Sequence, residues 1–346
     1  MILRRMIVFG IGMIAALLFA ELLLRVLPTP AGIVGAAPDP AWPAHRMVPN
    51  SGYVSSSGWS MENVQRGHIN NRGYVAPFAY RKGATVGVVI GDSFVEGMMN
   101  PYAAMLQSQL AHAMGRRPDS IYNFGTSGAS LPHYLGIAQL VGRDYRPQFA
   151  VVFIAARDFM EGFNSDPGIY RWSKGATLIE PVAEKQRGGF GQILRSLAIV
   201  RYARVNLKAT AAVLTKSGFE EAPKPQCGAA VLSGEDQNLL ARWVEQFPKA
   251  LNLPAGKVVL LFDADRPAIY SRTKSQPCLD RDAQARLALM KLARQAGMRV
   301  VDTEPVFRAD WTKHQIAFDR APVDAHWSPY AHRLIAPIVA AQLNGR

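Results

Sequence analysis

Cysteine is scarce in this sequence: the 346 residues include two, Cys227 and Cys278. No metal-ligand spacing accompanies them, so the sequence predicts no metal site, and nothing else in it calls for a cofactor. Outside the cytoplasm such a pair can form a disulfide, worth ~4 kcal/mol for a loop of this size. Two free structural cysteines are the alternative, and the sequence leaves both open.

Negative charge is also scarce, with 26 acidic against 39 basic residues and a formal net charge of +13. Charged residues make up 19% and hydrophobic residues 49%, which excludes a disordered chain and fits a globular protein. The excess of positive charge favours acidic partners. No aromatic-plus-basic module supports nucleic acid, so we expect none as a partner; an anionic membrane surface or an acidic polysaccharide fits at least as well.

One long apolar run occurs at the N-terminus, from Met6 to Ala20. The run alone is shorter than the ~20 residues of a membrane span, but extending it through Leu27 reaches that length. Glu21 and Arg25 then lie near the outer interface. A cleaved signal peptide and a buried core helix are the alternatives. No small-residue cleavage site follows the run directly, so we predict an uncleaved anchor over residues 1–28.

Two arginines, Arg4 and Arg5, precede the apolar run. Positive residues at this position keep the N-terminus in the cytoplasm and send the remaining chain outward. We therefore expect a single-pass protein of the inner membrane, with its main domain on the extracytoplasmic, periplasmic side.

The segment that follows the anchor, residues 28–60, is rich in Pro, Gly, Ala and Ser and indicates a linker or irregular arm. The stretch His68–Tyr74 is either a cover strand beside a site or a plain loop. We divide the chain into an anchor (1–28), a linker and N-terminal arm (29–80) and a main domain (81–346).

From residue 85 onward, strand and helix patterns alternate, which predicts a parallel sheet covered by helices on both faces, a three-layer α/β/α sandwich. An insertion at about 160–235 interrupts the alternation, and we expect it to be a lid or substrate-selecting subdomain. The predicted strands are 86–90, 121–124, 149–154, 258–262 and 299–302, and the predicted helices are 102–114, 131–140, 193–213, 236–247, 280–296 and a last helix that includes His332.

The main domain opens with Thr85–Gly97, an apolar run that ends at Gly91-Asp92-Ser93. A strand that ends in a glycine turn leaves its next side chain at the carboxyl edge of the sheet, where open α/β sheets place ligands. Ser93 there has the exposure that a nucleophile needs, and its own N–H faces the same side. An ordinary turn is the alternative.

A second block near the C-terminus places Asp324 two residues before His326. A serine nucleophile needs a base, and the base needs a carboxylate that orients it, so these two residues are the expected partners of Ser93. His332 and His314 compete for the role of base, but both positions are more typical of packing or surface histidines.

With both blocks present, the sequence resembles the SGNH/GDSL hydrolase superfamily, over roughly residues 85–160 and 255–340. The resemblance implies a flavodoxin-like fold with a central parallel sheet and a triad of Ser93, His326 and Asp324. The spacing here is Asp-x-His, whereas the commoner family pattern is Asp-x-x-His; similar endings occur in membrane-anchored members.

The resemblance also implies an oxyanion hole, formed by the N–H of Ser93, the N–H of Gly128 and a side chain that follows the third strand. The family has asparagine at that last position, where this chain has Arg157. A guanidinium can donate to an oxyanion or pair with an anionic group of the substrate. Arg157 can instead be a structural ion-pair partner of Asp158.

The function that these residues imply is an esterase or O-acyltransferase acting on acyl esters, with acetyl expected, of cell-envelope or exported polysaccharide. A catalytically impaired glycan-binding or scaffold protein of an envelope assembly is the second hypothesis, motivated by Arg157. A phospholipid esterase is the third. Envelope biosynthesis proteins are possible partners.

Overall fold

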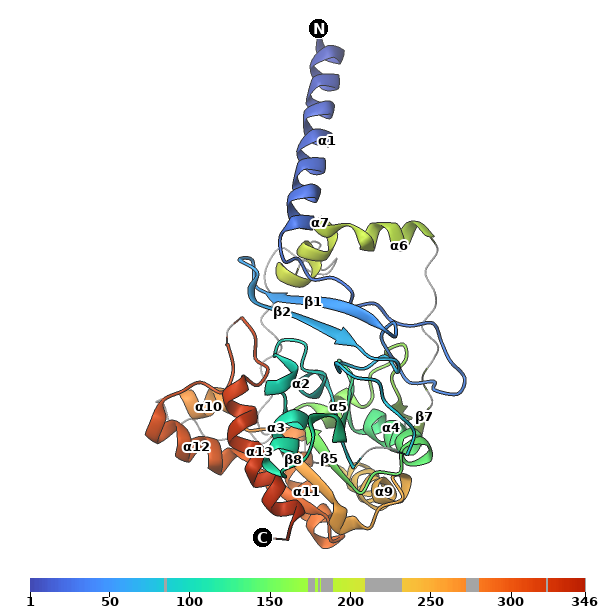
Figure 1. Cartoon of the computed structure of the whole chain (residues 1–346), viewed down its shortest axis with the longest axis vertical. Coiled ribbons are helices and arrows are strands. Elements are labelled where there is room, and N and C mark those ends of the chain that lie inside the picture. The colour runs from blue at the N-terminus through green and yellow to red at the C-terminus, as the bar shows by residue number, and fades with distance from the viewer. Residues whose placement is uncertain are drawn as a thin grey trace.

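The computed structural model describes residues 1–83, 86–173, 178–179, 181, 189–208, 232–271, 280–321 and 323–345. Cys227 and Cys278 lie outside these ranges, so the disulfide stays a prediction. Figure 1 shows a body of strands and helices from which one long N-terminal helix projects.

The centre of the body is a parallel sheet of five strands in the order β4-β3-β5-β8-β9. Counted along the chain this order is 2-1-3-4-5, the order of flavodoxin-like doubly wound folds, so the predicted fold class is confirmed. Every residue of the first four strands is buried, as their apolar runs predict. The strands are β3 (Gly87–Gly91), β4 (Ile121–Gly125), β5 (Phe149–Ile154), β8 (Val258–Phe262) and β9 (Arg299–Asp302).

Successive residues of a strand point to opposite faces of the sheet. Both faces of this sheet therefore carry apolar side chains, and helices cover both. Ile90 belongs to one core with Tyr134 and Trp243, whereas Val89 belongs to the other with Phe307 and Ile335. The first core is covered by α4 (Leu131–Asp144), α9 (Gly234–Ala250) and α11 (Arg281–Gln295), and the second by α3 (Leu106–Ala113), α12 (Thr303–His314) and α13 (Pro329–Leu343).

Several short helices follow the carboxyl ends of strands. The first of them begins at Ser93 itself. The predicted helix 102–114 is divided into a 3₁₀ turn and α3, and α12 was not predicted. The short elements are α2 (Ser93–Glu96), α5 (Asp158–Glu161), α10 (Arg266–Tyr270) and the 3₁₀ turns η1 (Tyr102–Ala104), η2 (Pro118–Ser120) and η4 (Ala255–Lys257).

The predicted linker is wrong in part, because it contains a hairpin of β1 (Ser51–Ser57) and β2 (Glu62–Ile69). The strands are antiparallel, with Tyr53 opposite Gly67. Figure 1 shows the hairpin lying between the N-terminal helix and the helices and strands of the body. A second, two-residue pair joins β6 (Arg171–Trp172) to β7 (Leu178–Ile179).

The N-terminal helix α1 (Ile2–Val26) buries none of its residues in the protein and is long and apolar enough to cross a membrane. A signal sequence passes the same test.

The described part of the insertion after residue 188 lies at the base of α1 (Figure 1). It contains α6 (Gly189–Ser196), α7 (Ala198–Arg201) and the π-helical turn η3 (Tyr202–Asn206), in place of one helix over 193–213, of which 209–213 lie outside the described residues. These elements contact α1 and the hairpin. The role of the insertion as a lid or substrate-selecting subdomain stays a prediction.

Candidate active site

The candidate nucleophile, Ser93, is the first residue of α2 and follows β3 after a single intervening residue, Asp92. The Asp92 carboxylate accepts a hydrogen bond from the N–H of Phe94, 2.9 Å away, and so caps the helix. Gly91 leaves room for this sharp turn, because a Cβ there would come within 2.4 Å of the Val95 side chain. The turn from strand to helix therefore fixes Ser93 at the carboxyl edge of the sheet.

The structure brings Ser93 together with both predicted partners. Its Oγ lies 2.7 Å from Nε2 of His326, and Nδ1 of His326 lies 2.6 Å from Oδ1 of Asp324. The same carboxylate oxygen accepts the backbone N–H of His326 at 3.0 Å. When Asp324 accepts a hydrogen bond from Nδ1–H of His326, the proton stays on Nδ1. Nε2 is then unprotonated and can accept a hydrogen bond from the Ser93 hydroxyl.

The pKa values of two carboxylates of the site, Asp324 and Asp92, are shifted in opposite directions. Burial acts to raise the pKa of Asp324, but the hydrogen bonds from the ring and amide of His326 outweigh it and hold this pKa below its ordinary value. At Asp92, burial is the largest cause and raises the pKa to about 7, against the hydrogen bond from Phe94. Asp324 is thus the ionised partner of the histidine at neutral pH.

The competing histidines lie elsewhere. His332 is buried within α13, with Nε2 3.4 Å from Nδ2 of Asn100 and its ring against Trp327. His314 ends α12, with Nδ1 3.7 Å from a carboxylate oxygen of Asp310. His326 is the histidine that contacts the serine.

The predicted oxyanion block follows β4. Gly128 has φ of +78°, a left-handed conformation that favours glycine, and an added Cβ would meet open space. The turn is closed by other amides, since Thr126 donates to the carbonyl of Gly91 and Ala129 donates to that of Thr126. The role of the Gly128 N–H as an oxyanion donor stays a prediction.

Glu96, which the sequence reasoning missed, holds this block against α2. Its buried carboxylate accepts hydrogen bonds from the hydroxyl and, at 3.4 Å, from the amide of Ser127, the residue before Gly128. Burial raises the pKa of Glu96 despite these bonds. A glutamate three residues after the serine points to the same side of a helix, which is the signal that could have identified it.

Arg157 follows β5, as predicted. The alternative prediction, an ion pair between Arg157 and Asp158, is wrong. Its Nε lies 3.5 Å from Oε1 of Glu161, and 69% of its side chain is exposed. Asp158 instead accepts bonds from the Tyr134 hydroxyl at 2.9 Å and the Ala155 amide at 2.8 Å. Burial raises the pKa of Asp158 well above its ordinary value. The contact of Arg157 with an oxyanion stays a prediction.

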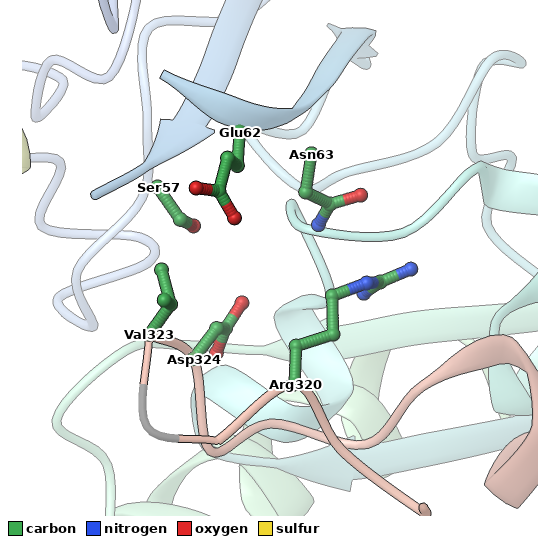
Figure 2. Close-up of a pocket in the computed structure, with 6 residues that line it drawn as sticks. All are labelled: Ser57, Glu62, Asn63, Arg320, Val323 and Asp324. Carbon is green, nitrogen blue, oxygen red and sulfur yellow. The ribbon is translucent and has the colours of Figure 1, made fainter. Parts of the chain in front are cut away.

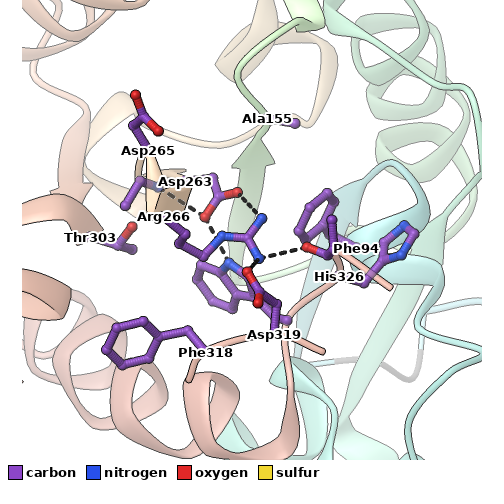
Figure 3. Close-up of polar contacts among 12 residues, drawn as sticks. Phe94, Ala155, Asp263, Asp265, Arg266, Thr303, Phe318, Asp319 and His326 are labelled. Carbon is purple, nitrogen blue, oxygen red and sulfur yellow. Dashed lines mark hydrogen bonds and ion pairs between the residues drawn. The ribbon is translucent and has the colours of Figure 1, made fainter. Parts of the chain in front are cut away.

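A buried ion-pair network, also missed by the sequence analysis, lies beside Phe94 and His326 (Figure 3). The Arg266 guanidinium lies 2.9 Å from Asp263 and 2.7 Å from Asp319, and Trp327 donates its indole N–H to Asp263 at 2.7 Å. Asp263 follows β8 directly. A polar residue at the carboxyl end of a central strand was the signal available in the sequence.

The ring of Phe94, next to Ser93, connects this network to His326. It lies 4.7 Å from the His326 ring, 5.0 Å from the Phe153 ring and 5.3 Å from the Arg266 guanidinium carbon. These contacts fix the plane of the imidazole from one side.

A pocket of about 290 Å³ opens where the hairpin faces the loop that carries Asp324. Figure 2 shows side chains from the hairpin above and from the loop below, with Asp324 directed toward the hairpin. Of its six lining residues, Val323 is apolar and five are polar or charged: Ser57, Glu62, Asn63, Arg320 and Asp324. Within the described ranges, no group of three or more His, Cys, Asp or Glu side chains is placed to hold a metal ion.

No family model matches the sequence, and no curated protein matches it. Solved structures are similar to it over about three quarters of its length. An α/β hydrolase enzyme from the metagenome of Lake Arreo, Spain, is 14% identical, with 77% of this chain and 97% of that chain covered and a TM-score of 0.40. A catalytic mutant of Axe2, an acetylxylan esterase from Geobacillus stearothermophilus, is 13% identical, with 76% and 95% covered and a TM-score of 0.40. A candidate SGNH hydrolase from Slackia heliotrinireducens is 14% identical, with 75% and 99% covered and a TM-score of 0.34.

Proposed function

We propose that this protein is a serine-dependent SGNH-type ester hydrolase or O-acyltransferase. The proposal rests on one observation, the unbroken chain of short contacts from the Ser93 hydroxyl through the His326 ring to the Asp324 carboxylate. A hydroxyl, an imidazole and a carboxylate in this order are the parts that acyl transfer to serine requires.

In the first half of the reaction, Nε2 of His326 takes the hydroxyl proton while Oγ of Ser93 bonds to the ester carbonyl carbon. The bond from that carbon to the alcohol oxygen then breaks, and His326 returns the proton to the departing alcohol. In the second half, His326 takes a proton from water or from a sugar hydroxyl, whose oxygen bonds to the carbonyl carbon of the acyl-serine. The bond from that carbon to Oγ of Ser93 then breaks, and His326 returns the proton to Oγ. Water as acceptor gives an esterase, and a sugar hydroxyl gives a transferase.

The developing oxyanion needs donors on the same side as the serine. We assign this role to the N–H groups of Ser93 and Gly128, with Arg157 at the position of the third donor. In this proposal the exposed guanidinium of Arg157 breaks its ion pair with Glu161 and donates to the oxyanion. Breaking the pair costs little free energy, because it lies at the surface.

The substrate class we propose is an acyl ester, with acetyl first, on cell-envelope or exported polysaccharide. The polar pocket beside Asp324 suits a hydroxyl-rich chain, and the net charge of +13 favours an anionic one. We place the reaction outside the cytoplasm, with α1 as the membrane anchor.

The test uses the full chain in detergent or nanodiscs, assayed on p-nitrophenyl acetate and on acetylated polysaccharide. Ser93→Ala should lower kcat by ~10⁶, as loss of the nucleophile does in other serine enzymes. A fluorophosphonate probe should label the wild type and spare the variant. Turnover that survives Ser93→Ala would disprove the mechanism, and a preference for long acyl chains would favour a phospholipid ester.

The second candidate is a catalytically impaired protein that uses the same cleft to bind glycan or to scaffold an envelope assembly. The observation that favours it is Arg157, an ion-pair partner of Glu161 at the position where the resembled family has asparagine. An unlabelled wild type that still retains glycan binding would support this candidate over the enzyme.

A further inference from the structure

The N-terminal helix is joined to the insertion by a specific contact. The Glu21 carboxylate of α1 accepts hydrogen bonds from the backbone N–H groups of Ala198 and Ile199, both at 3.0 Å, in the first turn of α7. Arg25, one turn further along α1, donates to the same carboxylate at 2.8 Å. The helix is thus part of the folded structure, because Glu21 supplies the cap that α7 needs.

This contact fixes the level of α7 along α1. Glu21 directly follows the apolar run that ends at Ala20. An α-helix rises ~1.5 Å per residue, so the groups bonded to Glu21 lie within a few ångströms of the end of that run. If α1 crosses a bilayer, α7 is held where hydrocarbon gives way to head groups.

The elements on either side of α7 expose apolar and basic side chains together. In α6, Ile193 is 62% and Leu194 43% exposed. Beyond α7, Val205 and Leu207 are exposed between Arg204 and Lys208, which are also exposed. Figure 1 shows α6 running across the direction of α1. A helix that exposes apolar side chains and runs across the direction of a candidate membrane span, with exposed basic residues close to it in the sequence, fits an interfacial position.

The hairpin adds an aromatic side chain to the same region. Trp59, in the turn between β1 and β2, is 76% exposed. Its carbonyl accepts a hydrogen bond from the Tyr202 hydroxyl at 2.6 Å, and Asn206 donates to the carbonyl of Gly58 at 3.0 Å. The turn is therefore attached to η3, and an exposed tryptophan is typical of the membrane–water interface.

We propose that residues 189–208 and the turn around Trp59, together called the collar, form a second membrane contact that rests on the head groups of an anionic bilayer beside α1. Continuity with α1, the exposed basic residues and the interfacial aromatic all favour a lipid surface as the occupant. This contact is independent of the reaction at Ser93. It also requires that α1 is retained, because removal of a signal sequence would take Glu21 away from α7.

The experiment measures tryptophan fluorescence of the full chain in liposomes that contain lipids brominated on the acyl chain. Trp59 is a suitable reporter, because Trp42, Trp172, Trp243 and Trp327 are buried and Trp311 is partly buried. We expect bromolipid to quench the wild type at least twice as strongly as Trp59→Phe. Trp311→Phe, on α12 of the body, is the matched control and should be quenched as the wild type is.

A second pair of variants tests the apolar residues of the collar. Ile193→Ser with Leu194→Ser should weaken the quenching of Trp59 at least twofold. Leu287→Ser with Ile316→Ser should leave it unchanged, because these residues are 55% and 46% exposed but lie outside the collar. Replacing anionic by zwitterionic lipid should also weaken it.

Equal quenching of the wild type and Trp59→Phe would overturn the proposal, and so would failure of the full chain to enter liposomes. A concentration-dependent dimer that protects Trp59 from bromolipid would give the surface to a second copy of the chain instead, and would overturn it as well.

Discussion

The guanidinium of Arg266 donates a hydrogen bond of 2.6 Å to the carbonyl oxygen of Ala325, the residue between Asp324 and His326. The same guanidinium pairs with Asp263, which follows β8, and with Asp319, which lies in the loop before Asp324. One buried cation therefore connects the edge of the sheet to the segment that carries both Asp324 and His326.

Replacing this cation should affect both stability and catalysis. Arg266→Met leaves Asp263 and Asp319 as buried carboxylates without their cation, which should lower the free energy of unfolding by ~3–5 kcal/mol. It should also slow labelling of Ser93 by a fluorophosphonate, since the loop loses its attachment. Urea unfolding and labelling rates provide the measurements.

The matched control is Arg308→Met, because Arg308 forms an exposed pair with Glu304 one turn away. Its loss should cost ~1 kcal/mol or less and leave labelling unchanged. Similar effects of the two substitutions would contradict the positioning role of Arg266.

Asp324→Asn should lower kcat by ~10⁴ with little change in KM. The amide keeps the shape of the carboxylate, but it no longer fixes the proton on Nδ1 of His326 or stabilises the charged ring. Asp310→Asn, at the longer contact with His314, is the control and should retain full activity. A mild loss at Asp324 would mean that another group orients the histidine.

Arg157→Ala distinguishes the two roles of this side chain. If the guanidinium donates to the oxyanion, kcat should fall by ~10²–10³, and Arg157→Asn should restore part of it. Glu161→Gln removes the ion pair but keeps the donor, so its kcat should stay near that of the wild type. Equal, small effects of Arg157→Ala and Glu161→Gln would assign Arg157 to the surface pair alone.

Buried His332 should make the protein less stable in acid. Burial lowers the pKa of His332 to about 3, so the unfolded chain binds a proton below pH ~6.5 that the folded chain does not. Stability is therefore lost as the pH falls from ~6.5 toward 3, by ~1.4 kcal/mol per pH unit for this group.

Between pH 7 and pH 5, the loss in the free energy of unfolding should be ~2 kcal/mol smaller in His332→Gln than in the wild type. The comparison with a variant is needed because Asp92 acts in the opposite direction. Its pKa is raised to about 7, so its contribution to stability increases as the pH falls. An unchanged pH dependence in His332→Gln would show that this histidine titrates normally.

Local sequence patterns were sufficient where one segment defines its own structure. The strands Phe149–Ile154, Val258–Phe262 and Arg299–Asp302 have the predicted bounds, since each apolar run is closed by polar or small residues. The hairpin was missed because its stretch has the composition of a loop and is attached to distant residues such as Asn206. Composition does not report such attachments.

For the site, the sequence indicated Ser93, Asp324 and His326 from their residue types and order, and the structure brings the three together. It did not indicate Arg266 or Glu96, because one charged residue in a strand–turn–helix segment has many possible partners until the chain folds. The partner of Arg157 is different. Residues adjacent in a helix do not face each other, whereas residues four apart do, so Glu161 was the better choice over Asp158.

The contact between Ser93 and His326 joins residues that are 233 positions apart. All five strands of the central sheet end by Asp302, before the loop that carries the histidine begins. During synthesis, Ser93 therefore has no contact with His326 until the segment that follows Asp302 has been made and has packed against the sheet. A chain interrupted between Asp302 and Asp324 carries all five strands of the sheet described here but lacks both partners of Ser93, so the contact between Ser93 and His326 forms only after synthesis has passed residue 326.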